Sequence, residues 1–600
     1  MHPAPSFRAG LAALVLVPCL AQAATDSPPS EPEVVVTANR VRLDIDRSLA
    51  SVTVIDRARI ERYGELDLVD LLRAEAGLDV VRTGGLGSQT SVFLRGTGFN
   101  QVLVLIDGVR VSSATTGAYV FEQLPLAQVE RIEIVRGPRA ALYGSDAIGG
   151  VIQIFTRRSN RADASAGVGT QGTWKLDAGA GWAIGEGHAG LRLGKVDTEG
   201  FSAQNPRGFA YDPDRDGYAQ TSASFDLGVP LGAAWLETLA QETRGEVEFD
   251  QGSSDMLNRQ VSVGVSESGG EDWSLRASLV ENEIETPDFF SRFETRRHQL
   301  EWQHRLRTGE HHALLWGLSW VEDEGASVDT ASAQDQYRAT RTHRAGFAAW
   351  RGEGGNTDWE LAGRHDDYDG FGGRSSAQAA LGVWLGPDWR LRGSFGQGFR
   401  APNLNELYSP GFGGLFAGNP DLAPERSHTA ELALGYRQQD WQFDLALYDT
   451  RVRDLIDFSG GTNFQAINVG RARMRGAELG WRWTPGSWRL GGNLGWQQAQ
   501  NELTGADLLR RAPRKLNLEL ARSEGAWDFQ IDLHAAAARP DLAGMLPGYG
   551  VVGASVGRRL ATNWSLALRL DNLFDRDYEL ARGFNAPGAS ALLQLRWQGG

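Results

Sequence analysis

The segment Trp564-Ser-Leu-Ala-Leu-Arg-Leu570 alternates apolar and polar side chains, and this alternation is the feature that decides the fold. The same rhythm recurs at 174–182, 273–279 and 389–395, each time with a tryptophan at the start. Successive side chains of a strand point to opposite faces, so each run suits an apolar medium on one face and a polar medium on the other. Aromatic residues near the ends of such strands are typical of barrels in the outer membrane.

The connections between these runs beyond Arg158 are of two kinds. Gly185-Glu-Gly187 and Gly386-Pro-Asp388 are short, whereas the polar stretches 199–217, 245–258 and 404–425 are long. Short turns on one rim and long loops on the other are typical of outer-membrane barrels, which must close on themselves because lipid leaves no open edge satisfied. Residues 159–600, at roughly 20 per strand and connection, predict a transmembrane β-barrel of about 22 antiparallel strands.

Residues 44–158 have the texture of a small α/β domain. Apolar residues at helical spacing predict a helix between Arg59 and Leu72, and the continuously apolar run 101–108 predicts a strand covered on both faces. Further strands are expected at 127–136 and 147–154. Since a 22-stranded barrel has a lumen wide enough to need a plug, we predict that this N-terminal α/β domain fills it. A secreted sandwich array or propeller would require a uniform repeat, and the sequence has none.

The N-terminal residues predict export. Arg8 precedes an apolar run at 11–20 and Ala21-Gln-Ala23, which together have the form of a signal peptide over 1–23; an uncleaved anchor helix would need a longer run. The one cysteine, Cys19, lies in this segment, so the mature chain is expected to be stable without disulfides. The net charge of −15 argues against a nucleic-acid partner.

A short β-prone run follows the Pro-rich linker expected over residues 24–43. It consists of Glu33, Val34, Val35, Val36, Thr37 and Ala38. Such a run beside a flexible tether can add to the sheet edge of a partner protein, or it can be the first strand of the next domain. The residues alone leave both readings open.

Two acidic stretches carry the most distinctive chemistry. Asp212, Asp214 and Asp216 alternate before Gly217 as in the first half of an EF-hand loop, but Ala223 stands where that loop has its bidentate glutamate. The missing ligands could come from the stretch 249–255, about one hairpin further along, so we expect the two loops to be neighbours on one rim. Calcium would then hold them together; the alternative is a solvated rim whose aspartates bind no metal.

Evidence for catalysis or a transition metal is weak. His298, His304, His311 and His312 are close in sequence but lack the spacing of a metal motif. No Gly-x-Ser-x-Gly elbow is present. The sequence therefore predicts no enzyme.

Several motifs show a family resemblance that spans the whole chain after the signal peptide. The segment 33–40 is similar to a TonB box with its flank, and Phe93-Leu-Arg-Gly96, 104–110, 129–138 and 143–151 are similar to plug signatures. In the barrel the resemblance continues at 401–404, 418–425, 468–478 and 571–578. The chain thus resembles the TonB-dependent outer-membrane receptors and, among them, the cobalamin receptors; the plug motifs themselves do not separate cobalamin from a ferric siderophore.

The resemblance implies the partners and the site. It implies active transport of a corrinoid driven by TonB, in a monomer surrounded by outer-membrane lipid and lipopolysaccharide, with calcium at the acidic loops. The implied substrate positions are Ser91, Thr116, Gly117 and Arg510, with Gln89 and Gly98 at contact positions where the residue type departs from the family. The implied calcium ligands are Asp212, Asp214, Asp216, Asp250, Asp255 and the backbone carbonyl of Phe249. A ferric siderophore receptor is the alternative.

Overall fold

The structure is a computed structural model of the chain, and it describes residues 35–36, 40, 43–64, 66–158, 161–267, 272–411, 415–460, 462–542 and 544–599. The predicted signal peptide and Glu33, Val34, Thr37 and Ala38 of the expected TonB box lie outside the described residues. Everything below concerns the unit Val35–Gly600.

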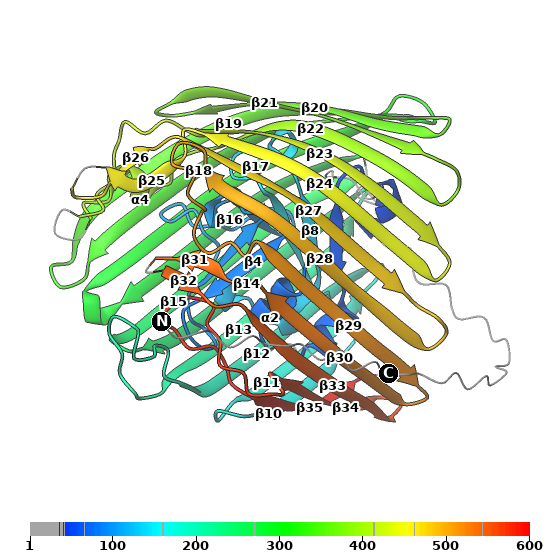
Figure 1. The fold of residues 1–600 in the computed structure, drawn as a ribbon. Coiled ribbons are helices and arrows are strands. Elements are labelled where there is room, and N and C mark those ends of the chain that lie inside the picture. Colours follow the sequence, from blue (N-terminus) through cyan, green and yellow to red (C-terminus); the bar gives the residue numbers. More distant parts are fainter. Residues whose placement is uncertain are drawn as a thin grey trace, which may run out of the picture. The chain divides into compact units, whose positions relative to one another are not determined.

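Twenty-two strands form one closed barrel, which confirms the predicted architecture (Figure 1). Each strand pairs antiparallel with its neighbours, and β10 (Asp163–Gly169) closes the ring against β35 (Ser590–Gln598), with Asp163 opposite Gln598. The strands between them are β11 (Trp174–Ile184), β12 (Gly187–Phe201), β13 (Asp216–Leu231), β14 (Ala234–Phe249), β15 (Gly252–Glu267), β16 (Trp273–Thr286), β17 (Ser291–Arg307), β18 (His312–Asp329), β19 (Gln334–Gly354), β20 (Thr357–Tyr368), β21 (Gly372–Trp384), β22 (Trp389–Arg400), β23 (Glu425–Gln438), β24 (Trp441–Arg453), β27 (Arg471–Trp483), β28 (Trp488–Asn501), β29 (Arg514–Glu524), β30 (Trp527–Ala536), β33 (Tyr549–Ala561) and β34 (Trp564–Asp571).

The alternation in the sequence becomes an alternation in burial. Along β20, Ala362 and Arg364 point into the barrel and are buried. Leu361, which precedes Ala362, points outward and is exposed. Exposed tryptophans such as Trp389 and Trp564 begin strands at one rim. The outer face is therefore apolar and the lumen polar, as expected for a barrel in lipid.

The two rims differ in the length of their connections. One rim has tight turns such as Gly185–Glu186 and 439–440; the other, the long-loop rim, has loops such as 202–215, 401–424 and 572–589. The predicted long loop at 245–258 is wrong, because these residues belong to β14 and β15, which meet in a tight turn at Asp250 and Gln251. The acidic side chains there belong to strand ends that extend beyond the expected membrane. The polarity of this stretch therefore does not indicate a loop.

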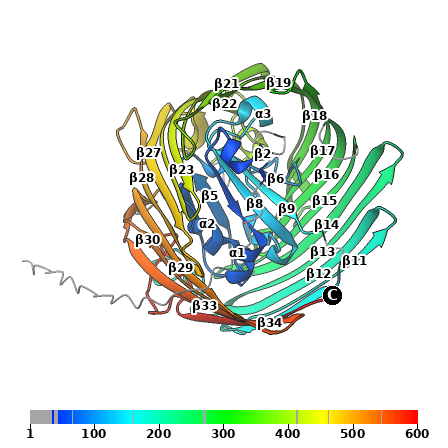
Figure 2. The ribbon, with the colours of Figure 1, turned by 90° about the vertical axis from the view of Figure 1, so that its right-hand side faces the viewer.

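The N-terminal domain is a mixed sheet inside the barrel (Figure 2). The sheet order is β3-β8-β9-β6-β7, with β6 and β9 parallel. The bounds are β3 (Val52–Ile55), β4 (Leu78–Arg82), β5 (Thr90–Leu94), β6 (Val102–Ile106), β7 (Val109–Arg110), β8 (Val129–Arg136) and β9 (Gly150–Thr156), with β4 and β5 forming a separate hairpin. All five residues of β6 are buried, as the continuously apolar run predicts.

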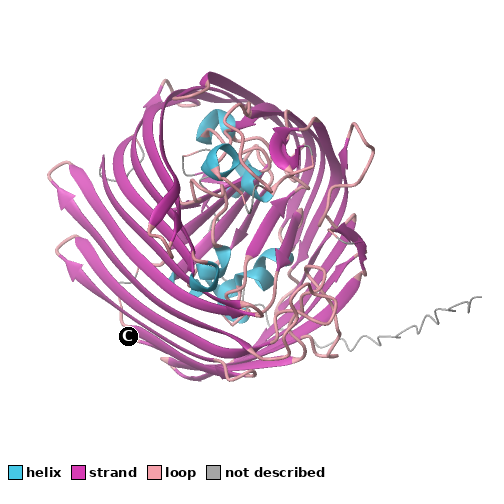
Figure 3. Ribbon diagram, turned by 90° about the vertical axis from the view of Figure 1, so that its left-hand side faces the viewer, coloured by secondary structure: helices cyan, strands magenta, loops and turns pink. Residues whose placement is uncertain are grey.

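Short helices cover this sheet within the ring of barrel strands (Figure 3). The single helix predicted between Arg59 and Leu72 is instead two, because Gly64 adopts a positive φ of 81° and Asp67 caps a new start. The helices are α1 (Arg57–Arg62), α2 (Leu68–Arg73) and α3 (Ala140–Tyr143), with α4 (Leu404–Tyr408) in a barrel loop. The 3-10 turns are η1 (Ile45–Arg47), η2 (Phe99–Gln101), η3 (Phe121–Gln123), η4 (Leu126–Gln128) and η5 (Pro287–Phe289).

Small hairpins complete the fold. They are β1 (Val35–Val36) with β2 (Leu43–Asp44), β25 (Ile456–Gly460) with β26 (Gln465–Asn468), and β31 (Arg539–Asp541) with β32 (Gly544–Leu546). Within the described part of the chain, none of the helices combines the length and the apolar character needed to cross a bilayer.

Candidate functional site

Three plug loops, at 83–89, 96–100 and 112–118, reach toward the long-loop rim. The first lies against the end of β12, since a Cβ on Gly84 would come within 2.9 Å of the Cβ of Ala203. The second receives hydrogen bonds from Arg511 in the loop between β28 and β29. The third lies under the loop between β22 and β23, where Asn403 donates to the carbonyl of Thr116 at 3.0 Å. These loops form what we name the apical plug surface.

The loop with Thr116 and Gly117 is held tightly. The Gly117 N–H donates to the carbonyl of Ser113 at 2.9 Å, and its φ of 74° is one that side chains rarely adopt. A Cβ on Gly117 would approach the Cβ of Asn100 to 3.2 Å, so this loop adjoins the second loop. Thr116 and Gly117 are half-buried, which leaves part of each accessible from the long-loop side.

Gln89 and Ser91 belong to the hairpin of β4 and β5. Gln89 is exposed, and its carbonyl accepts from the Thr83 N–H at 3.2 Å; Ser91 is half-buried opposite Val81. Beneath this hairpin, the Thr90 N–H donates to the Glu122 carboxylate at 3.3 Å. Burial of Glu122 in this confined place raises the pKa of its carboxyl group to about 8.

Gly98 and Arg510 differ in how they relate to the plug. The Gly98 N–H donates to the side chain of Gln101 at 2.7 Å, which shapes the second loop. Arg510 does not contact this loop, because its guanidinium pairs with Asp541 at 2.8 Å. Its neighbour Arg511 is the residue that contacts the plug: it donates to the carbonyls of Gly96 and Thr97 and lies 4.2 Å from the ring centre of Phe93.

The acidic loops are neighbours, as their spacing predicts. The Asp250 carboxylate accepts from the N–H groups of Gln204 at 3.0 Å and Asp212 at 2.9 Å, which ties the turn after β14 to the loop before β13. The Asp216 carboxylate accepts from the Ala203 N–H at 2.5 Å, and Asp214 and Asp250 are close enough to interact with it electrostatically. Asp212 and Asp214 are exposed at the rim.

Asp255 does not join this group. It lies opposite Glu246 and Glu285 in a row on the outer face of the barrel, whereas the neighbouring Met256 is buried on the lumen side. Phe249 ends β14 and its ring lies 6.1 Å from that of Phe289. Among the described residues, no three acidic, histidine or cysteine side chains converge as metal ligands. Aspartates 212, 214, 216 and 250 lie on neighbouring segments of the long-loop rim, and Asp255 lies apart from them.

At the opposite rim, the chain leaves the plug along the short turns. Val35 and Val36 pair with Asp44 and Leu43, a ladder of only two residues. Arg390 at the start of β22 donates to the carbonyls of Asp46 and Ser48, and Arg437 at the end of β23 pairs with Asp46 at 2.7 Å. The valines of the expected TonB box are therefore placed at the rim away from the apical plug surface.

The plug signature 93–96 supplies a buried charged contact between plug and barrel wall. Arg95 is buried and pairs through both terminal nitrogens, with Glu478 at 2.8 Å and with Glu431. The guanidinium carbon of Arg95 also lies 4.6 Å from the centre of the Tyr448 ring. Sequence reasoning found this motif but not its partners, because glutamates 383 and 336 residues away give no local signal. Arg511 was missed for a similar reason: nothing in the Arg510-Arg511 pair shows which side chain turns to the plug.

Comparisons with known proteins agree with this geometry. A family model described as "TonB dependent receptor-like, beta-barrel" matches residues 154–573, and one described as "TonB-dependent Receptor Plug Domain" matches 44–151. The "Vitamin B12 transporter BtuB" of Vibrio cholerae serotype O1 is 29% identical and covers 98% of both chains. The protein of that name from Photobacterium profundum is 28% identical, over 92% of this chain and 93% of its own.

Solved structures show the same fold at lower identity. A mutant of the ferric enterobactin receptor PfeA from Pseudomonas aeruginosa superimposes with a TM-score of 0.78 at 19% identity, over 94% of this chain and 100% of its own. The siderophore receptor PirA from Acinetobacter baumannii superimposes with a TM-score of 0.77 at 17% sequence identity. The copper transporter OprC superimposes with a TM-score of 0.76 at 18% sequence identity. Each comparison covers 91% of this chain and 98% of the other chain. The barrel, the plug inside it and the two matching family models lead to one conclusion: the chain belongs to the TonB-dependent receptor family.

Proposed function

We propose that this receptor takes up cobalamin and related corrinoids across the outer membrane into the periplasm. Receptors of this family are transporters of the outer membrane rather than enzymes, and they depend on TonB for energy. The observation that carries the choice of cargo is the near full-length similarity to proteins named vitamin B12 transporters, which extends over plug and barrel alike. The solved siderophore and copper receptors share only the fold at under 25% identity and do not bear on cargo.

The apical plug surface supports this proposal by its chemistry. A corrinoid presents many amide groups around a broad ring, so its receptor needs several spaced donors and acceptors rather than one charge. The plug loops offer one side-chain amide, from Gln89, and two hydroxyls, from Ser91 and Thr116. Gly98 and Gly117 have no side chain, so they leave room for a bulky ligand above the plug. Phe99 adds an aromatic side chain that is 39% exposed. Arg510, held by Asp541, would contact cargo only above the plug.

Energy transfer is proposed to run through the valines at the opposite rim. TonB would add its own strand to residues 33–38, since a β-prone segment can be recognised by main-chain pairing. The present ladder between β1 and β2 holds only Val35 and Val36, so little has to be broken before TonB pairs with them. Cargo on the apical plug surface and TonB on this segment then act on one domain from its two ends.

Calcium is proposed as a structural ion of the acidic loops. Asp212, Asp214, Asp216 and Asp250 would hold it with carboxylate oxygens, and it would offset their mutual repulsion. Asp216 and Asp250 accept hydrogen bonds from the N–H groups of Ala203 and Gln204. The loop that begins with these two residues adjoins the plug loop 83–89. Ordering of this loop by calcium would therefore reach the cargo surface directly.

Titration of the purified receptor with cyanocobalamin, with calcium and after its chelation, tests both proposals. Tight binding that weakens at least about tenfold on chelation is expected, with Asp250→Asn reproducing the loss and Asp255→Asn, on the other face, behaving as wild type. Calcium titrated alone gives a second readout of the same two variants. Saturable binding of a ferric siderophore instead of cyanocobalamin would overturn the proposed cargo, and equal calcium affinity of both variants would overturn the proposed ligands.

A further inference from the structure

Arginines gather on the outer face of β23 to β29, at the ends near the long-loop rim. We name this set the arginine patch; it consists of Arg426, Arg451, Arg453, Arg471, Arg473, Arg475 and Arg514. The alternation of burial shows that they point outward: in β24, Val452 between two patch residues is fully buried. They are not lumen residues and have no route to the cargo surface.

The strand register places these charges directly beside one another. Arg426 lies opposite Arg453, and Arg453 lies opposite Arg471, so one row across three strands is all arginine. The next row places Arg451 opposite Arg473. Like charges directly opposite on neighbouring strands are destabilising, because strands lie only ~4.8 Å apart. Such rows are tolerable when an anion sits between them.

Few protein groups neutralise the patch. Arg473 donates to Asp449 at 2.9 Å, Arg451 lies 3.5 Å from the same carboxylate, and Glu502 interacts electrostatically with Arg473. Arg475 donates to the amide oxygen of Gln498 at 2.9 Å. Within the described ranges, no carboxylate forms an ion pair with the four remaining guanidinium groups, those of Arg426, Arg453, Arg471 and Arg514. Seven arginines against two acids leave the patch strongly positive.

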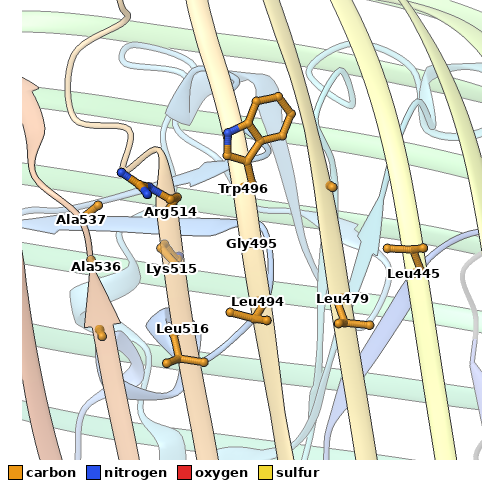
Figure 4. Close-up of a pocket in the computed structure, with 12 residues that line it drawn as sticks. Leu445, Leu479, Leu494, Gly495, Trp496, Arg514, Lys515, Leu516, Ala536 and Ala537 are labelled. Atoms are coloured by element: carbon orange, nitrogen blue, oxygen red, sulfur yellow. The ribbon is translucent and has the colours of Figure 1, made fainter. Parts of the chain in front are cut away.

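An apolar groove begins immediately below the patch. Leu445, Leu479, Leu494 and Leu516 lie opposite one another across four strands on the same outer face. They line an open groove of about 560 Å³, together with the small side chain of Ala477. Trp496 and Arg514 lie at its upper end (Figure 4). Trp496 is opposite Arg514, so an aromatic ring and a cation mark the boundary between apolar and charged rows.

The opposite sector of the same rim is different. There Arg244, Arg296 and Arg338 also point outward, but each pairs with a glutamate: Glu242 at 2.8 Å, Glu281 at 2.8 Å and Glu324 at 2.9 Å. The outer row of Glu246, Asp255 and Glu285 is acidic. An excess of unpaired arginine is therefore a local property of β23 to β29 and not of the whole rim.

We propose that the arginine patch and the groove together bind one phosphorylated, acylated lipid of the outer leaflet. Its phosphates would lie among the guanidinium groups, which match phosphate oxygens in charge and geometry. One acyl chain would lie in the groove below Trp496. The charge complementarity and the continuity of patch and groove favour a lipid over a soluble anion. This site rests on the outer-membrane location of the receptor and not on the identity of its cargo.

The test compares two matched triple variants of the purified full-length receptor. One removes the unpaired row (Arg426→Gln, Arg453→Gln, Arg471→Gln), and the control removes paired arginines from the other sector (Arg244→Gln, Arg296→Gln, Arg338→Gln). Binding of diphosphorylated lipid A, of the same lipid without phosphates and of inorganic phosphate is measured for each by native mass spectrometry. Each basic group near an anionic lipid contributes roughly a factor of five, so the first variant should bind lipid A about a hundredfold more weakly.

The remaining measurements distinguish a lipid ligand from a free phosphate ion. We expect the control variant to bind as wild type, the dephosphorylated lipid to bind poorly, and Ala477→Phe, which fills the groove without changing charge, to weaken lipid A binding. Equal loss in both triple variants, unchanged binding in the first, or inorganic phosphate binding as tightly as lipid A would overturn the proposal. Cyanocobalamin binding on the same preparations is scored separately, so failure of the cargo proposal gives a different result.

Discussion

The interior of the plug is apolar, whereas its contact with the barrel combines apolar clusters with buried charges. Inside the plug, Ile55, Leu71, Ile132 and Ile154 pack with no exposed surface in one apolar cluster. Where the plug meets the wall, apolar and polar contacts are mixed. Ile148 of the plug packs with Val452 and Met474 of the barrel. Arg95 pairs with its two glutamates, and Arg297 donates to the carbonyl of Ser112 at 2.6 Å. The plug interior excludes water, whereas the polar groups of the wall contact can exchange their partners for water.

The small cavities follow the same division. Three of them, of about 20 to 40 Å³, lie at or near the wall and are lined by both plug and barrel residues, for example Asp79 with Lys515 and Glu122 with Tyr218. Cavities of this size with polar walls can hold a water molecule. A hydrogen bond within the protein is only a little more favourable in free energy than one to water. Polar contacts that water can reach can therefore be broken one after another at a small cost in free energy. The difference teaches that the polar contacts at the wall can be exchanged for water one at a time, whereas the apolar packing inside the plug cannot.

The largest effect is expected at the charged contact when it is broken from one side. Arg95→Met leaves Glu431 and Glu478 buried without their cation, which should cost the plug about 3–5 kcal/mol of opening free energy. Hydrogen exchange of plug amides in the full-length receptor measures this. Adding Glu431→Gln and Glu478→Gln should restore part of the loss, since both carboxylates are then neutral. Arg136 loses its ion pair with Glu478 in this variant but keeps its hydrogen bonds to Ala76 and Thr53. A triple variant as open as the single one would show that the contact itself holds the plug.

A core substitution should cost nearly as much and should have no such rescue. Leu71→Ala removes a fully buried side chain and leaves a cavity, with an expected loss of about 2–4 kcal/mol in the same hydrogen-exchange measurement. Leu124→Ala, at a partly buried position beside the cluster, is the matched control and should lose less. Similar losses at both positions would mean that the plug interior is not the close-packed region described here.

Glu122 gives the smallest effect and a pH dependence of defined sign. Its folded pKa of about 8 lies above the ordinary value of 4.5, so the folded plug binds the proton more tightly than the unfolded plug. Plug stability should therefore fall as pH rises from about 4.5 to about 8. Because the Glu122 side chain is only half-buried, solvent screening keeps this change below the losses expected for Arg95→Met and Leu71→Ala. Glu122→Gln should flatten this slope, whereas Glu130→Gln, at an exposed position of β8, should keep it. A slope unchanged in Glu122→Gln would contradict the assignment.

The barrel was predictable because its signal is local and repeated. Alternation with period two, aromatic strand ends and chain length together gave the closed barrel of 22 strands, and the motif 93–96 marked the plug. Errors arose where polarity had a different cause: acidic residues at 245–258 lie on strands that extend past the membrane, and Gly64 divides a helix whose apolar spacing runs on.

The positions of the candidate site residues in the fold were predictable to the level of loops and not of side chains. Thr116, Gly117, Gln89 and Gly98 do lie on the plug loops that face the long-loop rim. Which of Arg510 and Arg511 turns to the plug depends on Asp541, a residue in another loop, and the wall partners of Arg95 come from β23 and β27. Contacts between segments hundreds of residues apart are set by barrel register, which no local pattern reveals.

The central claim is that cargo bound at one end of the plug is transported by a pull on the other. Uptake of labelled cyanocobalamin should be measured in cells whose only receptor is this chain, as wild type or as Val35→Pro, alongside binding to the same cells at 4 °C. Proline removes a donor from the strand that TonB would pair with, so we expect uptake to be abolished and binding to be unchanged. Uptake by Val35→Pro at the wild-type rate would contradict the account.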